Sequence, residues 1–149
     1  MSRTDLTDAL RATRGALVAF AEGCTDDQWT ARPLGDDDPR TVGVIVDHVA
    51  DAYEYIGSWI TELAAGGAAE VNAEVVDGLN ARHAAAGDPS RAQACAHLTA
   101  SGDDLIALIE SVPDELVAPE ARITRLAEIA ARHADAHRDE LQRALGSPA

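Results

Sequence analysis

The sequence predicts an all-α protein, a four-helix bundle folded as a single domain over residues 1–149. The composition favours helix over sheet, because 31 residues are alanine and only 3% are aromatic. Four separate segments each carry one apolar stripe, with apolar residues at alternating steps of three and four. Helices of about 20 residues are about 30 Å long, and their stripes are buried only when the helices pack together.

The first helix is expected over residues 4–22, with Thr4 as its N-cap and Gly23 at its end. Its stripe consists of Leu6, Leu10, Thr13, Leu17 and Phe20. Residues 24–40 are expected to form a loop, because they include a glycine, two prolines and three consecutive aspartates.

The second helix, expected over residues 41–65, has a wide apolar face, which is typical of a helix that contacts two neighbours. Its stripe consists of Val42, Ile45, Val49, Ala52, Ile56, Trp59 and Leu63. The glycine pair at residues 66–67 ends this helix. A long connection follows up to residue 89, and its middle, residues 71–85, has room for a short helix.

The third helix is expected over residues 90–111, with Ser90 as its N-cap and Pro113 just beyond its end. The fourth is expected over residues 120–145 and stops at Gly146. Short joins favour antiparallel neighbours for helices one and two, and for helices three and four. The connection between helices two and three is long enough to cross the bundle, which allows these two to run parallel.

The charge and the remaining composition exclude several classes of protein. A formal net charge of −14 without a basic patch argues against nucleic-acid binding. No apolar run approaches the ~20 residues of a membrane span, and residues 1–5 do not begin a signal peptide, so we expect a cytoplasmic protein. Cys24 and Cys95 form no disulfide framework; Cys24 lies beside acidic residues in the expected loop, and Cys95 belongs to an apolar stripe.

The positions of three histidines point to a metal site. His133 and His137 lie four residues apart, so they share one face of the fourth helix, at stripe positions where leucine is expected. His48 lies on the buried flank of the second helix. Three neutral imidazoles from two facing helices can bind a borderline divalent ion such as Zn²⁺ or Ni²⁺, whereas Mg²⁺ and Ca²⁺ prefer oxygen ligands. Three protein ligands leave one coordination position open for water or substrate, as in catalytic sites.

A second interpretation of this pattern stays open from the residues alone. A pair of histidines four apart on an alanine-rich helix is often a solvated surface feature. The metalloprotease signature is absent, since residue 134 after the first histidine is alanine. His83 is expected to be solvated, with an acid–base role as the alternative. His97 is expected to be exposed or half-buried.

Several motifs together resemble the DinB-like superfamily of bacterial four-helix-bundle proteins, which includes thiol-dependent S-transferases and the N-terminal domain of mycothiol-dependent maleylpyruvate isomerase. The motifs are a histidine in helix two (residues 46–50), a late HxxxH in helix four (residues 133–138) and an acidic-Gln-Trp turn (residues 25–29). The resemblance covers essentially the whole chain. It implies a bundle with a long crossover, a metal held by His48, His133 and His137, and often a homodimer.

The resemblance also suggests candidate substrate-binding residues in the crossover. Asn80 follows a leucine, and similar Leu-Asn pairs occur near the pocket in related proteins. Asn80 and Arg82 have donors suited to a carboxylate or an amide of a bound molecule. An exposed polar position on a helix is the alternative for both residues.

Three functional hypotheses follow. The first is a metal-dependent enzyme, a transferase or isomerase, that activates a low-molecular-weight thiol of the mycothiol type, because a metal lowers the pKa of a bound thiol. The second is a metal-dependent hydrolase that activates water. The third is a non-catalytic metal-binding protein whose bundle serves as a dimer module.

Overall fold

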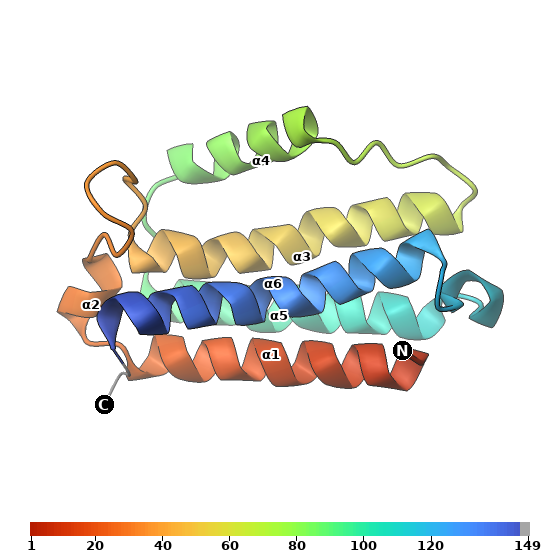
Figure 1. The fold of residues 1–149 in the computed structure, drawn as a ribbon, viewed down its shortest axis with the longest axis horizontal. Coiled ribbons are helices and arrows are strands. Elements are labelled where there is room, and N and C mark those ends of the chain that lie inside the picture. The colour runs from red at the N-terminus through yellow and green to blue at the C-terminus, as the bar shows by residue number, and fades with distance from the viewer. Residues whose placement is uncertain (147–149) are drawn as a thin grey trace.

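The computed structural model describes residues 1–146, and these residues form helices and loops without a strand. The elements in chain order are α1 (Arg3–Gly23), α2 (Asp26–Thr30), α3 (Val42–Ala64), α4 (Ala73–Ala85), α5 (Arg91–Ser111), the 3₁₀ turn η1 (Asp114–Val117) and α6 (Arg122–Leu145). The all-α prediction is therefore confirmed, and the four long helices α1, α3, α5 and α6 lie side by side as a bundle (Figure 1).

Side-chain caps explain where most of the helices begin. The hydroxyls of Thr41 and Ser90 accept hydrogen bonds from backbone N–H groups in the first turns of α3 and α5, and the Ser90 cap confirms the prediction. The predicted cap at Thr4 is wrong, because α1 begins before that residue. Ser2 caps this helix, and the Asp5 carboxylate accepts a hydrogen bond from the Ser2 backbone N–H in return.

The loop expected at residues 24–40 contains a short helix that the apolar pattern did not predict. Thr25 and Gln28 form a reciprocal capping box around α2. The helix ends after one turn, and its Trp29 is only 7% exposed. The indole N–H of Trp29 donates to the Pro89 carbonyl oxygen at 3.0 Å, which ties this helix to the end of the crossover.

The packing of the helices differs from the expected order. Helices α1 and α6 run in one direction and α3 and α5 in the other, so the crossover does join two parallel helices (Figure 1). Each helix packs chiefly against two others: α3 against α5 and α6, and α1 against the same pair. The expected antiparallel neighbours, α1 with α3 and α5 with α6, instead lie diagonally across the bundle.

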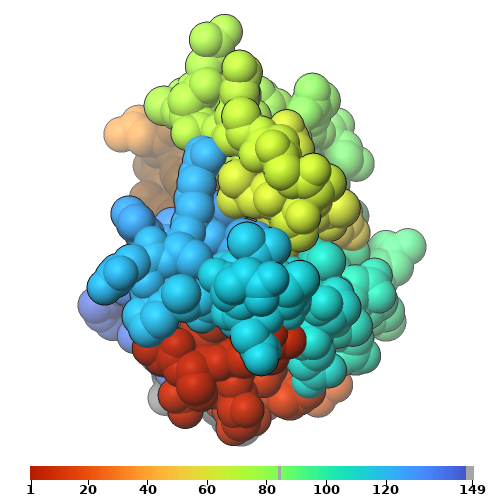
Figure 2. Space-filling model, turned by 90° about the vertical axis from the view of Figure 1, so that its right-hand side faces the viewer, coloured from red at the N-terminus to blue at the C-terminus, as the bar shows by residue number. Residues whose placement is uncertain are grey.

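The segments between consecutive long helices make this diagonal arrangement possible. The joins contain α2 and η1, and each join reaches across one end of the bundle. Figure 2 shows one of these ends, where the teal residues around η1 lie between the red start of α1 and the yellow end of α3. The joins are thus short in sequence, yet long enough to span the diagonal.

A glycine at the start of α3 is required by the packing of α2. A Cβ atom added at Gly43 would lie 2.8 Å from the Trp29 ring, which is closer than side-chain contacts allow. We expect Gly43→Ala to lower the free energy of unfolding by about 1–3 kcal/mol, because the indole must shift. Urea denaturation followed by circular dichroism measures this change.

Gly15 provides the control for that substitution. It lies within α1 and is exposed, and no heavy atom lies within 4 Å of the position that a methyl group would occupy there. Gly15→Ala is expected to stabilise the protein by about 0.5–1 kcal/mol, since alanine is the better helix former. Equal effects of the two substitutions would contradict the steric role of Gly43.

No helix in the part of the chain that the structure describes is long and apolar enough to cross a membrane. The cytoplasmic location and the homodimer stay predictions.

Candidate metal centre

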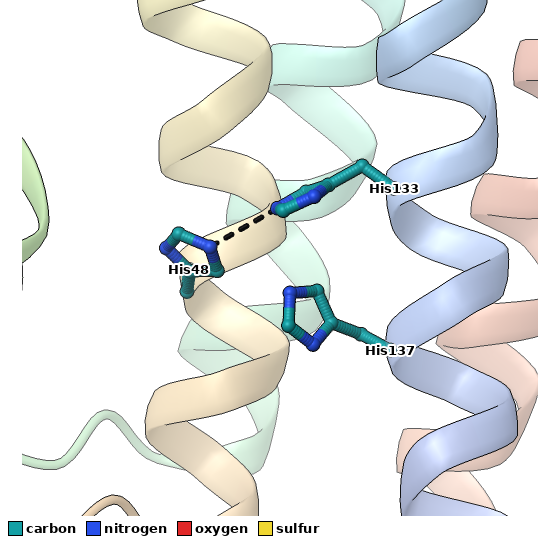
Figure 3. Close-up of side chains that lie close together, drawn as sticks. All are labelled: His48, His133 and His137. Atoms are coloured by element: carbon teal, nitrogen blue, oxygen red, sulfur yellow. Dashed lines mark hydrogen bonds between the residues drawn. The ribbon is translucent and has the colours of Figure 1, made fainter. Parts of the chain in front are cut away.

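The three predicted histidines converge between α3 and α6. His133 and His137 lie one turn apart on the same face of α6, and His48 lies on the facing side of α3. Figure 3 shows the three rings pointing into one space between the two helices. The structure therefore brings together residues that are 85 positions apart in the chain.

The separations of the ring nitrogens suit a shared ligand. The Nε2 atoms of His48 and His133 lie 3.0 Å apart, and one ligand nitrogen from each of the three rings lies within 4.8 Å of the others. Nitrogens bound to one tetrahedral Zn²⁺ at 2.0–2.1 Å are about 3.3 Å apart. The His48–His133 pair is thus close to this separation.

Burial keeps these rings in the form that binds metals. Burial and the neighbouring histidines lower the pKa of His48 to about 3, and burial together with His137 lowers the pKa of His133 to about 4. Burial also lowers the pKa of His137, although Glu140 opposes this change. At neutral pH the imidazoles of His48 and His133 are uncharged, so a ring nitrogen of each has a free lone pair.

The donor set fits a nitrogen-binding divalent ion. One hydrogen bond between two neutral imidazoles, as between His48 and His133, uses one N–H and one lone pair. The lone pairs of the donor ring and of the third converging ring remain, in a largely buried space. A borderline ion such as Zn²⁺ or Ni²⁺ satisfies all three at once, whereas Mg²⁺ and Ca²⁺ require oxygen ligands.

Glu140 orients one of the three rings and was not predicted from the sequence. Its Oε1 atom lies 3.3 Å from His137 Nδ1, from which it can accept a hydrogen bond. This bond places the ring proton on Nδ1 and leaves the Nε2 lone pair for a ligand. The sequence could have indicated Glu140 through its spacing, because a residue three positions after His137 shares its helix face.

Removal of the Glu140 carboxylate is expected to weaken metal binding. We expect Glu140→Gln to lower zinc affinity about 10-fold, because partners of metal-bound histidines typically contribute that much. Competition with a chromophoric zinc chelator measures the affinity. Asp139→Asn removes a neighbouring carboxylate outside the cluster and is the control; an equal loss in both variants would indicate a general charge effect.

His83 lies beside the cluster, and the prediction that it is solvated is wrong. Helix α4 covers α3 here, so that the His83 side chain is only 11% exposed and its ring centre lies 6.0 Å from that of His48. His83 Nε2 is 3.3 Å from the Val44 carbonyl oxygen, and Asp47 and Asp51 lie within 3.8 Å of its ring nitrogens.

His97 links α5 to the same side of α3. Its Nδ1 lies 2.8 Å from Asp47 and its Nε2 2.5 Å from Glu54, and the ring is half-buried as expected. Burial lowers the pKa of His97, but the two carboxylates outweigh this and raise it. His97 is thus suited to an ion pair between helices, in contrast to the uncharged cluster.

The structure separates the two candidate substrate-binding residues. Asn80 lies one turn before His83 on the same face of α4, and its buried Oδ1 finds no hydrogen-bond partner among the described residues. Arg82 is exposed and lines a surface hollow with Glu70 and Asn72, away from the histidines. Asn80 therefore lies next to His83 on the inner face of α4, whereas Arg82 lies at the surface.

The surroundings of the two cysteines, Cys24 and Cys95, disfavour a nucleophilic role. Cys24 is buried, and its thiol lies 3.4 Å from the Phe20 carbonyl oxygen. Burial raises the pKa of both Cys24 and Cys95, which disfavours the reactive thiolate. For Cys24 the main cause is burial, and the acidic residues beside it in the sequence are not among the causes.

A pocket of about 220 Å³ adjoins the cluster at His133. It lies between α3, α6 and the crossover, which contributes Val71 and Val76. The aromatic side chains of Tyr55 and Trp59 line its α3 side. The sequence placed Trp59 on the apolar stripe of this helix, and only the packing shows that part of this face borders a cavity.

The fold and the site together define a class: four-helix bundles with one long crossover and a largely buried three-histidine cluster between facing helices. A family model described as the DinB superfamily matches residues 9–141, and the chain therefore belongs to the DinB superfamily. Comparisons with curated proteins and with solved structures gave no match.

Proposed function

We propose that this protein is a metal-dependent enzyme that holds one Zn²⁺ or Ni²⁺ ion through His48, His133 and His137 and acts on a small thiol. The observation that carries the proposal is the convergence of three imidazoles beside a pocket. Three protein ligands leave a position open for a substrate atom. Membership of the DinB superfamily supports the use of a low-molecular-weight thiol, of the mycothiol type, in transfer or isomerisation.

The chain contributes binding and orientation in this proposal. The uncharged rings of His48 and His133 act as ligands and not as bases, because their lowered pKa values keep them unprotonated. Glu140 holds the ring of His137 in one tautomer. A bound metal would lower the pKa of a thiol at the open position, so that the thiolate forms at neutral pH. The neighbouring pocket would receive the rest of the reacting molecule.

Cobalt substitution tests the proposal directly. The metal-free protein is loaded with one equivalent of Co²⁺, and a small thiol such as 2-mercaptoethanol is added while the absorption spectrum is recorded. We expect a thiolate-to-cobalt charge-transfer band that is absent from the oxygen analogue, ethylene glycol. The zinc form is then assayed for thiol consumption with a panel of electrophiles.

Each other outcome would overturn a stated part of the proposal. Failure to bind Co²⁺, Zn²⁺ or Ni²⁺ would reject the metal site. Metal binding with ester hydrolysis that is independent of thiol would favour a hydrolase. Metal binding without a charge-transfer band and without turnover would favour a non-catalytic metal-binding protein.

A further inference from the structure

The pocket beside His133 has an almost wholly apolar lining. Its walls come from α3, the crossover with α4, and α6, and it is lined by Ala52, Tyr55, Ile56, Trp59, Val71, Val76, Leu126, Ile129 and His133. None of these residues is an arginine, an aspartate or a glutamate. The imidazole of His133 is thus the one group in the lining that belongs to the cluster.

The charge around the pocket disfavours an anion. A buried carboxylate needs a cation or several converging donors. The lining contains no arginine, and its side-chain donors are limited to the hydroxyl of Tyr55, the indole N–H of Trp59 and the ring of His133. The chain as a whole has a formal net charge of −14, which adds repulsion of anions. The phenol of Tyr55 is uncharged at neutral pH, and burial raises its pKa further above the ordinary value of 10.0. Apolar groups, by contrast, gain from leaving water here.

The size and shape of the pocket suit one aromatic ring. A dry apolar cavity of about 150 Å³ is known to bind benzene, and this pocket measures about 220 Å³. The rings of Tyr55 and Trp59 lie 5.0 Å apart at a tilt of 52°, so they present an aromatic wall for edge or face contacts. A ring with a short substituent would fill the space and place the substituent towards His133.

We infer that this pocket binds an uncharged group of the size of a substituted benzene ring, and that such a group defines the substrate class. The assignment of the substituent as the reacting end rests on the proposed function, whereas the binding of the ring does not. A lining without a cationic side chain disfavours dicarboxylates as the molecules that bind in this pocket.

Fluorine NMR with two matched probes tests the inference. The uncharged probe is 4-fluorobenzyl alcohol and the charged probe is 4-fluorobenzoate, each titrated into metal-free and zinc-loaded protein. We expect the alcohol to bind on the order of tenfold more tightly than the benzoate, because the carboxylate must be desolvated. In the metal-free protein, equal affinities or tighter binding of the benzoate would overturn the inference.

Three variants locate the binding. Val76→Phe fills the pocket and is expected to reduce alcohol binding on the order of tenfold. Ala9→Phe places the same ring in a hollow of about 340 Å³ between α1 and α6 and should leave binding unchanged. Ile129→Arg adds a cation at the rim, where Ile129 is 47% exposed, and should shift the preference towards the benzoate. An unchanged affinity in Val76→Phe together with an unchanged preference in Ile129→Arg would place the binding elsewhere.

Zinc content, measured on the same samples, separates this inference from the proposed function. Binding of the alcohol without zinc binding would retain the pocket and reject the metal enzyme. Zinc binding without binding of the alcohol would reject the pocket assignment and leave the metal site in place.

Discussion

His133→Ala is expected to abolish stoichiometric zinc binding and to leave the helical bundle folded. His133 is the ring closest to His48, with 3.0 Å between their Nε2 atoms, so its loss leaves two ligands on different helices. The expected fall in zinc affinity exceeds about 100-fold, because loss of an outer partner alone typically costs about 10- to 100-fold. Elemental analysis after dialysis against zinc gives the stoichiometry, and circular dichroism reports the helix content.

His97→Ala is the matched control for this experiment. It removes a half-buried histidine that pairs with Asp47 and Glu54 and does not belong to the cluster. We expect this variant to keep one zinc per chain. Retention of one zinc per chain by His133→Ala would show that the three-histidine assignment is wrong, as would the loss of zinc from His97→Ala alone.

The metal-free protein is expected to lose stability as the pH falls from 6.5 towards 4. The unfolded chain takes up protons on His48 and His133 near the ordinary value of 6.5, whereas the native state holds the pKa values at about 3 and about 4. Stability from the neutral rings is therefore fully present above pH 6.5 and lost as the pH falls through this window. For His48 the loss reaches about 3 kcal/mol at pH 4.

Urea unfolding in the presence of a chelator measures this pH dependence. Carboxylates also titrate near pH 4, so the informative quantity is the difference between the wild type and His48→Leu at each pH. Leucine fills the site without a titratable group. As the pH falls, we therefore expect the free energy of unfolding of this variant to decrease less than that of the wild type. A constant difference between pH 6.5 and 4 would contradict the buried, neutral state of His48.

Local spacing in the sequence determined which segments are helices and which faces they bury. The four stripes correspond to the four long helices, and the hydroxyl of Ser90 begins α5 as expected. The same local rule placed His133 and His137 on one face of α6. The pairing of these two with His48 required only the further condition that the two apolar faces meet. The helical segments and their buried faces can be predicted from the sequence because they depend on residues three or four positions apart.

At the start of α1, a local capping box and contacts from distant residues both accompany the N-cap at Ser2. Both Ser2 and Thr4 have side chains that cap helices. The earlier start of α1 lets Arg3 reach the Glu110 carbonyl oxygen at 2.7 Å and Asp114 at 2.5 Å, across the end of the bundle. Asp5 completes the capping box at Ser2. This box was a local signal in favour of the earlier start, because the residue three positions after Thr4 is not acidic.

The sequence by itself determined the helical class, the crossover between helices two and three, and the three histidines of the candidate centre. Only the tertiary structure decided that consecutive helices lie diagonally, that α4 buries His83 and Asn80, and that an apolar pocket opens beside His133. The physical reason is the range of the interactions. Stripes and caps arise within a few residues, whereas neighbours, burial and cavities depend on how distant surfaces fit together.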